Sequence, residues 1–262
     1  MSLPDLALQI VYGRLAWALV AAAMLLAILP VLKPALLSTW LSKLSPKQSP
    51  AVFALRPRRS MANAAFVPGV VIATVVLMAL PDAASPAYWL TLVFQYPSAL
   101  LVGFSLVSLH ARWQGRPVRL VMPAGLSVPL VVAGLVLYLD AFGVLALGLY
   151  SGGFGAVAAP LVACSVAIAC AVAIVRGRAV AGATALLVAV LLFSVLRLPS
   201  GNLWDALLDP LLWSWALGSM VVAMFRQRAA RRAELVAPLA EPETSPIPEP
   251  VLAHAAAVNE QI

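Results

Sequence analysis

The sequence predicts an all-α fold, a polytopic transmembrane helical bundle of about seven spans with its N-terminus outside and its C-terminus in the cytoplasm. Of the 262 residues, 63% are hydrophobic and only 10% are charged, and the mean hydropathy is +0.99. A soluble domain carries about 25% charged residues because its surface faces water. The shortage of charge therefore indicates that most of this surface faces lipid.

Apolar runs of about 20 residues, enough for a helix to cross the hydrocarbon core, recur along the chain. The predicted spans are 15–32, 61–80, 87–109, 118–139, 154–175, 179–196 and 206–225. Together they define a transmembrane domain, residues 1–232. The Pro- and Glu-rich residues 233–262 are expected to form a disordered cytoplasmic tail, since such a composition does not form a packed core.

The first span is expected to be retained, because its positive charges follow the apolar run, whereas a cleaved signal peptide carries them before it. Directly after it, residues 34–44 place their apolar side chains on one helical face, with Ser38, Ser42 and Lys43 on the opposite face. This pattern predicts an interfacial helix on the inner leaflet.

The third span carries polar side chains at its midpoint, Gln95, Tyr96 and Ser98, around Pro97. Proline removes a backbone hydrogen bond and kinks a helix, so the freed carbonyl groups need other partners. The three polar residues are candidates for lining a substrate path. The commoner role of such residues is to tie neighbouring helices together.

Residues 141–175 contain no charged residue and as one helix would be about 52 Å long, too long for a single span. We expect one crossing from residue 154, preceded by an outer segment that is broken at Ser151-Gly152-Gly153. The sequence leaves open whether residues 141–155 are re-entrant, interfacial or an extra span.

The distribution of basic residues sets the predicted orientation. All but two of the 17 basic residues fall in the connections after the first, third and fifth spans or beyond the last, and the exceptions are Arg14 and Arg197. Because basic loops stay in the cytoplasm, this places the N-terminus outside. The acidic residues Asp5, Asp82, Asp140, Asp205 and Asp209 then all fall on the outer side, although they were not used to set the orientation.

The segment 201–210 is the most specific candidate site. Asn202 can cap a helix start, and Asp205 and Asp209 are four residues apart, hence on one face of a continuous helix. A carboxylate there could bind a cation, act as a general base or bind the head of a lipid-linked substrate. The alternative is two interfacial carboxylates that the helix dipole favours. Candidate substrate-binding residues are Gln95, Tyr96, Ser98, Asp140, Arg197, Asn202 and Trp204.

No catalytic or metal-binding motif accompanies these residues. The two cysteines lie six apart in one apolar run and no span has a histidine pair, so we expect no metal and no cofactor. The net charge of +7 lies in short clusters without interleaved aromatic residues, which argues against nucleic acid as a partner. Membrane lipids, and other integral membrane subunits, are the expected partners.

These features predict a multi-pass protein of the bacterial inner membrane, since a chain with 14 arginines, three lysines and abundant alanine is typical of a GC-rich bacterial genome. The expected role is an accessory subunit of an envelope assembly or a small permease-like carrier. The alternative is a membrane-embedded transferase or hydrolase that acts on a lipid-linked substrate at the outer face through Asp205 and Asp209.

Overall fold

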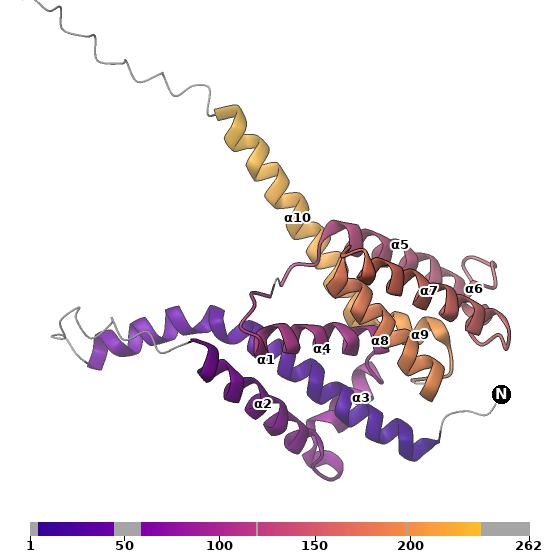
Figure 1. Ribbon diagram of the computed structural model, residues 1–262, viewed down its shortest axis with the longest axis horizontal. Helices are drawn as coiled ribbons and strands as arrows, with labels where there is room; N and C mark the ends of the chain where they lie inside the picture. Colours follow the sequence, from indigo (N-terminus) through magenta and orange to yellow (C-terminus); the bar gives the residue numbers. More distant parts are fainter. Residues whose placement is uncertain (1–4, 45–58, 119, 198, 237–262) are drawn as a thin grey trace, which may run out of the picture. The chain divides into compact units, whose positions relative to one another are not determined.

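The computed structural model describes residues 5–44, 59–118, 120–197 and 199–236 (Figure 1), and within them all regular structure is helical. The all-α prediction is confirmed for this part of the chain. The chain divides into two units, Met1–Val222 and Ala223–Ile262. The first unit holds the helical bundle. In the second unit the described residues are the end of the last helix. Of the predicted tail, residues 233–236 belong to this helix, and residues 237–262 lie outside the described residues.

The first half of the bundle comprises two long helices and a third that is interrupted. Its elements are α1 (Leu6–Leu44), α2 (Arg59–Met78), the 3-10 turn η2 (Asp82–Ala84), α3 (Pro86–Phe94) and α4 (Ala99–Trp113). The predicted interfacial helix at 34–44 is helical but continues α1 without a break. The expected single span at 87–109 is two helices, because the chain leaves helical geometry at residues 95–98.

The second half alternates long helices with short ones. Its elements are α5 (Ala124–Ala141), α6 (Leu149–Gly152), α7 (Ala158–Val175), α8 (Val180–Leu196), α9 (Leu203–Leu207) and α10 (Pro210–Val236). Between α5 and α7 the structure has a loop and a helix of four residues, too short to cross a membrane. Residues 141–155 therefore form no helix long enough to cross a membrane.

Small residues allow the helices of the first unit to approach closely. Helix α4 packs against α8, α8 against α7, and α1 against α2 and α4 (Figure 1). At Gly103 a β-carbon would lie 2.4 Å from the backbone oxygen of Ala185, so only glycine permits this contact between α4 and α8. The surrounding core includes Ala99, Ala189 and Phe193, all almost completely buried. Close packing at small residues is the usual way that helices associate in lipid.

Three described helices are long and apolar enough to cross a membrane, Leu6–Leu29, Ala124–Ala141 and Ala158–Val175. Shorter apolar helices lie at Phe66–Met78, Ala99–Trp113 and Val180–Leu196. Large apolar side chains on the long helices are exposed, for example Val132 on α5 and Ile168 on α7. An exposed apolar surface of this kind is compatible with a protein whose helices are surrounded by lipid.

Candidate functional site

The candidate residues separate into two sites. The first, called here the carboxylate cluster, contains Asp140, Tyr150, Ser200, Asn202 and Asp205. The second, called here the helix break, is the non-helical segment 95–98 between α3 and α4, together with the Asp209 side chain that contacts it. The two sites share no hydrogen bond among those that the described side chains form.

Asp140, near the end of α5, holds the following loop. Its Oδ1 accepts hydrogen bonds from the backbone N–H groups of Leu147 (2.7 Å) and Gly148 (3.0 Å), and its Oδ2 accepts one from Tyr150 (2.7 Å). Gly148, with φ 68°, precedes α6 as its N-cap. The carboxylate therefore turns the chain back toward the end of α5 and fixes the position of Tyr150.

The Tyr150 hydroxyl links this loop to α9. It donates to the Asp205 carboxylate at 3.1 Å from Oδ1, and the Ser200 hydroxyl donates to Oδ2 of the same group. Burial and the neighbouring Asp205 carboxylate raise the pKa of the Tyr150 phenol. The phenol thus remains a protonated donor at neutral pH, and residues 140, 150 and 205 form one connected network.

Asn202 completes the connection from the other side and is fully buried. Its Oδ1 accepts from the backbone N–H of Trp204, which confirms the predicted cap of a helix, and its Nδ2 donates to the Tyr150 carbonyl at 3.2 Å. A β-carbon on Gly153 would lie 1.8 Å from Asn202 Oδ1. Gly153 is therefore required for the close approach of α6 to α9.

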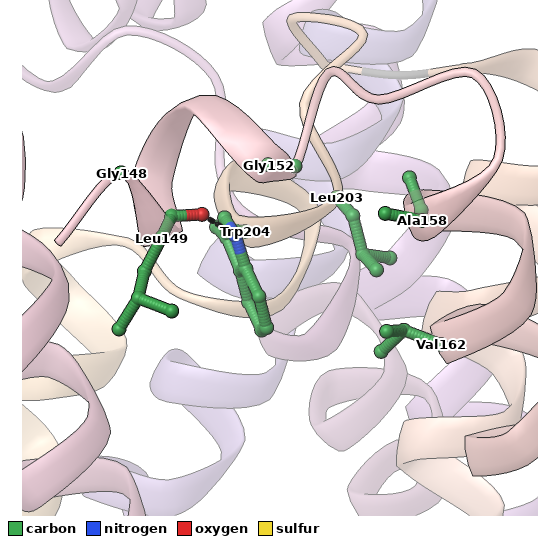
Figure 2. A pocket seen from close by; sticks show the side chains of 9 residues that line it. Gly148, Leu149, Gly152, Ala158, Val162, Leu203 and Trp204 are labelled. Carbon is green, nitrogen blue, oxygen red and sulfur yellow. Dashed lines mark hydrogen bonds between the residues drawn. The ribbon is translucent and has the colours of Figure 1, made fainter.

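A small apolar pocket of about 190 Å³ lies beside the cluster. Figure 2 shows the Trp204 indole between Leu149 on one side and Leu203, Ala158 and Val162 on the other. Trp204 Nε1 donates to the Leu149 carbonyl at 2.7 Å, which holds the ring in place. Glycines at positions 148, 152 and 153 also line the pocket, and at Gly152 a β-carbon would meet no atom within 4 Å.

The helix break is stabilised by α1. The Tyr12 hydroxyl donates to the Pro97 carbonyl at 2.8 Å, and Trp17 Nε1 donates to the Gln95 carbonyl at 3.1 Å. A β-carbon on Gly13 would lie 2.4 Å from the Tyr96 ring, so glycine allows α1 to approach this closely. These bonds satisfy two carbonyl groups that have no partner within a helix, because the chain is not helical at residues 95–98.

Asp209 stabilises the same break from the other side and is only 8% exposed. Its Oδ2 accepts from the backbone N–H of Ser98 at 2.6 Å, where α4 begins, and its Oδ1 accepts from Leu212 at 2.6 Å, in the first turn of α10. The Ser98 hydroxyl caps α4 by accepting from Leu101. One carboxylate thus satisfies N–H groups at two helix starts.

The structure separates the two aspartates that the sequence expected to share a helical face. Helix α9 ends at Leu207, Leu208 is extended (φ −141°, ψ 129°), and α10 begins at Pro210. Because the helix is interrupted, the spacing of four does not align Asp205 with Asp209. Asp205 belongs to the carboxylate cluster and Asp209 to the helix break.

Of the other predicted residues, Asp140, Asn202 and Trp204 lie in or beside the carboxylate cluster, and Gln95, Tyr96 and Ser98 form the helix break. Arg197 has a left-handed backbone (φ 55°), and its guanidinium carbon lies 5.3 Å from the centre of the Phe193 ring. Sequence reasoning missed Tyr150, Ser200 and Tyr12. Only the position of Tyr150 beside the Ser151-Gly152-Gly153 break offered a signal, since a tyrosine there has a hydroxyl to satisfy.

Within the described ranges, no group of three or more histidine, cysteine, aspartate or glutamate residues could hold a metal ion. Comparison with family models, with curated proteins and with solved structures found no match to this chain. The carboxylate cluster, the helix break and the pocket are therefore the features of this chain that bear on its function.

Proposed function

We propose that the chain is a multi-pass protein of the bacterial inner membrane that acts as an accessory subunit of an envelope assembly and performs no chemistry of its own. The observation that carries this proposal is that each candidate carboxylate accepts hydrogen bonds from the chain itself. Asp140 accepts from three backbone N–H groups, Asp209 from two, and Asp205 from two hydroxyl groups. Such carboxylates fix loops and helix starts.

The proposal includes seven spans with the N-terminus outside. Contacts between distant loops support it, because the carboxylate cluster joins the end of α5 to α9, which follows α8. The predicted orientation assigns both of these regions to the outer side.

Three contacts on the opposite, basic side agree with this arrangement. Arg112 at the end of α4 donates to the Leu26 carbonyl at 2.7 Å, near the end of the apolar part of α1. Trp215 Nε1 donates to the Leu120 carbonyl, and the Met122 N–H to the Ser219 hydroxyl, so the loop before α5 lies against α10. Each of these segments leads toward basic residues in the sequence, Lys33 after Leu26, Arg116 before Leu120 and Arg226 after Ser219. This order is expected for segments that run to a cytoplasmic side.

A small permease-like carrier is the second candidate, and the helix break favours it. Carriers often place interrupted helices around a buried polar site, with helix N-termini directed at a negative charge. Here the N-terminal ends of α4 and α10 both donate backbone N–H groups to the Asp209 carboxylate, so the negative charge belongs to the protein itself. In this version Asp209 would be the residue on which transport depends.

The transferase or hydrolase alternative can use only one of the two aspartates that the sequence suggested, because Asp205 and Asp209 belong to different sites. What favours it is the contact between the Ser200 hydroxyl and the Asp205 carboxylate, with an apolar pocket behind Trp204. A carboxylate that accepts from a hydroxyl is able to act as its general base. In this version Asp205, without Asp209, would carry the chemistry.

Separate replacement of Asp205 and Asp209 by asparagine in the native gene distinguishes the three proposals. The phenotype of a deletion strain and the amount of the protein in the membrane are measured for each variant. The accessory role predicts that activity follows abundance in both variants. Loss of activity at normal abundance in Asp209→Asn would favour the carrier, and the same result in Asp205→Asn would favour the enzyme.

A further inference from the structure

The apolar pocket between α6, α7 and α9 differs from the rest of the site in having no free polar group on its described side chains. It is lined by the leucines at 149 and 203, by Val162, by Ala158 and Ala159, by Trp204 and by three glycines. The one polar atom among these side chains, Trp204 Nε1, donates to the Leu149 carbonyl. The surface inside the pocket is therefore almost entirely apolar, which favours a hydrocarbon occupant.

We propose that this pocket binds a short stretch of the hydrocarbon tail of a membrane lipid. The pocket volume is about 190 Å³, and an apolar cavity of about 150 Å³ is large enough to hold benzene. A segment of one acyl chain therefore fits. The proposal rests on the embedding of the chain in a membrane, but it does not depend on whether the protein is a subunit, a carrier or an enzyme.

Exposed apolar side chains around the pocket favour a lipid as its ligand over a soluble molecule. Leu149 and Val162 line it and are 45% and 37% exposed, and Leu161, next to Val162 on α7, is 62% exposed. Helix α7 is one of the helices long and apolar enough to cross a membrane. The pocket adjoins the first turns of α7 at Ala158, Ala159 and Val162, so an acyl chain that packs along the apolar surface of this helix can reach it.

Trp204 makes the wall of the pocket rigid. Its indole is held by the Nε1 bond to α6, while its backbone N–H is capped by Asn202. The opposite wall is built from Ala158 and Val162 of α7, with Leu203 of α9 fully buried beside them (Figure 2). A pre-formed cavity binds a flexible chain at a lower entropic cost than one that must first be ordered.

Gly152 offers a way to fill the pocket without disturbing its walls. It lines the pocket, and a β-carbon built there meets no atom within 4 Å. Gly152→Leu should therefore occupy the space with a side chain. Gly69→Leu is the matched control, because Gly69 is exposed on α2 and also has open space around its β-carbon.

The test reconstitutes the full chain into phosphatidylethanolamine and phosphatidylglycerol vesicles whose acyl chains carry bromine, which quenches tryptophan fluorescence on contact. The Trp204 signal is the difference between the native chain and Trp204→Phe. We expect this signal to be strongly quenched, to lose most of its quenching in the Gly152→Leu background, and to keep it in the Gly69→Leu background. Equal quenching in all three backgrounds would overturn the proposal.

A second measurement does not depend on replacing Trp204. A phospholipid with a photoreactive acyl chain should crosslink to residues 148–162 or 203–204 in the native chain and in Gly69→Leu, but much less in Gly152→Leu. Crosslinks between two copies at this position, in place of lipid, would show that a partner side chain fills the pocket and would overturn the proposal. Failure of the chain to float with the vesicles would instead contradict the membrane embedding itself.

Discussion

At the scale of single residues, Asp209 is predicted to stabilise the fold from a buried position through the hydrogen bonds that its carboxylate accepts. Hydrogen bonds to charged groups contribute about 1.5–3 kcal/mol each, and both oxygens of this buried carboxylate accept backbone N–H groups. Asp209→Ala should lower the free energy of unfolding in detergent by about 3 kcal/mol or more. Asp209→Asn, which keeps one acceptor oxygen, should lose a smaller part.

Asp5 is the matched control, because it too accepts from a backbone N–H at a helix start, that of Ala7 in α1, but it is exposed. Asp5→Ala should cost about 1 kcal/mol or less. Equal losses for the two alanine variants would contradict the structural role assigned to Asp209 at the helix break.

Tyr150 provides a pH-dependent test of the carboxylate cluster. Since burial and Asp205 raise the pKa of its phenol above the unfolded value of about 10, the stabilisation is present below that pH and is lost as the pH rises through the folded pKa. The native chain should therefore be more stable than Tyr150→Phe at pH 7–9, and the difference should shrink above about pH 10. Thermal unfolding of both chains across this range measures it. A difference that grows with pH would be inconsistent with the network.

At the residue scale, local sequence signals account for one success and one failure, and a contact between distant residues accounts for the other failure. The cap at Asn202 follows from the preference of asparagine for helix starts. The alignment of Asp205 with Asp209 failed because Leu208 and Pro210 end one helix and start another. The contact of Tyr150 with Asp205 joins residues 55 positions apart, and no local pattern specifies it.

At the scale of helices, the contact between α4 and α8 depends on the absence of a side chain. Gly103→Ala would place its β-carbon 2.4 Å from a backbone oxygen on α8, which cannot rotate away. Overpacking of this kind costs about 1–3 kcal/mol. Gly218→Ala on α10 has open space and should be neutral or slightly stabilising. Unfolding of the two variants in detergent compares them, and equal stability would argue against close packing of α4 and α8.

Most of the apolar runs proved to be helices because hydrophobic length is a strong signal. The runs 118–139 and 179–196, for example, correspond to α5 and α8. The break at 95–98 was predicted only as a kink, since one proline does not reveal that Tyr12, Trp17 and Asp209 would stabilise several non-helical residues. Tertiary contacts thus decided whether this span continued as one helix.

At the scale of the whole molecule, the number of spans determines on which side every loop lies. Asp140 and Asp205 meet in one cluster although α7 and α8 intervene between them in the chain. In the proposed topology α7 and α8 both cross, and a pair of crossings returns the chain to the side on which this contact forms. The proposed topology has these two spans between residues 141 and 203 and seven in total.

Single cysteines in a chain without Cys164 and Cys170 test this arrangement. Asp5→Cys and Ser151→Cys should react with an impermeant maleimide in intact spheroplasts, whereas Gln114→Cys and Arg176→Cys should react only after lysis. All four positions are exposed, so a difference in labelling reports the side of the membrane. Because one long helix separates residue 114 from 151 and another separates 151 from 176, labelling of 151 and 176 from the same side would mean that α7 does not cross. The lopsided distribution of arginine would then need a cause other than retention of positive charge in the cytoplasm.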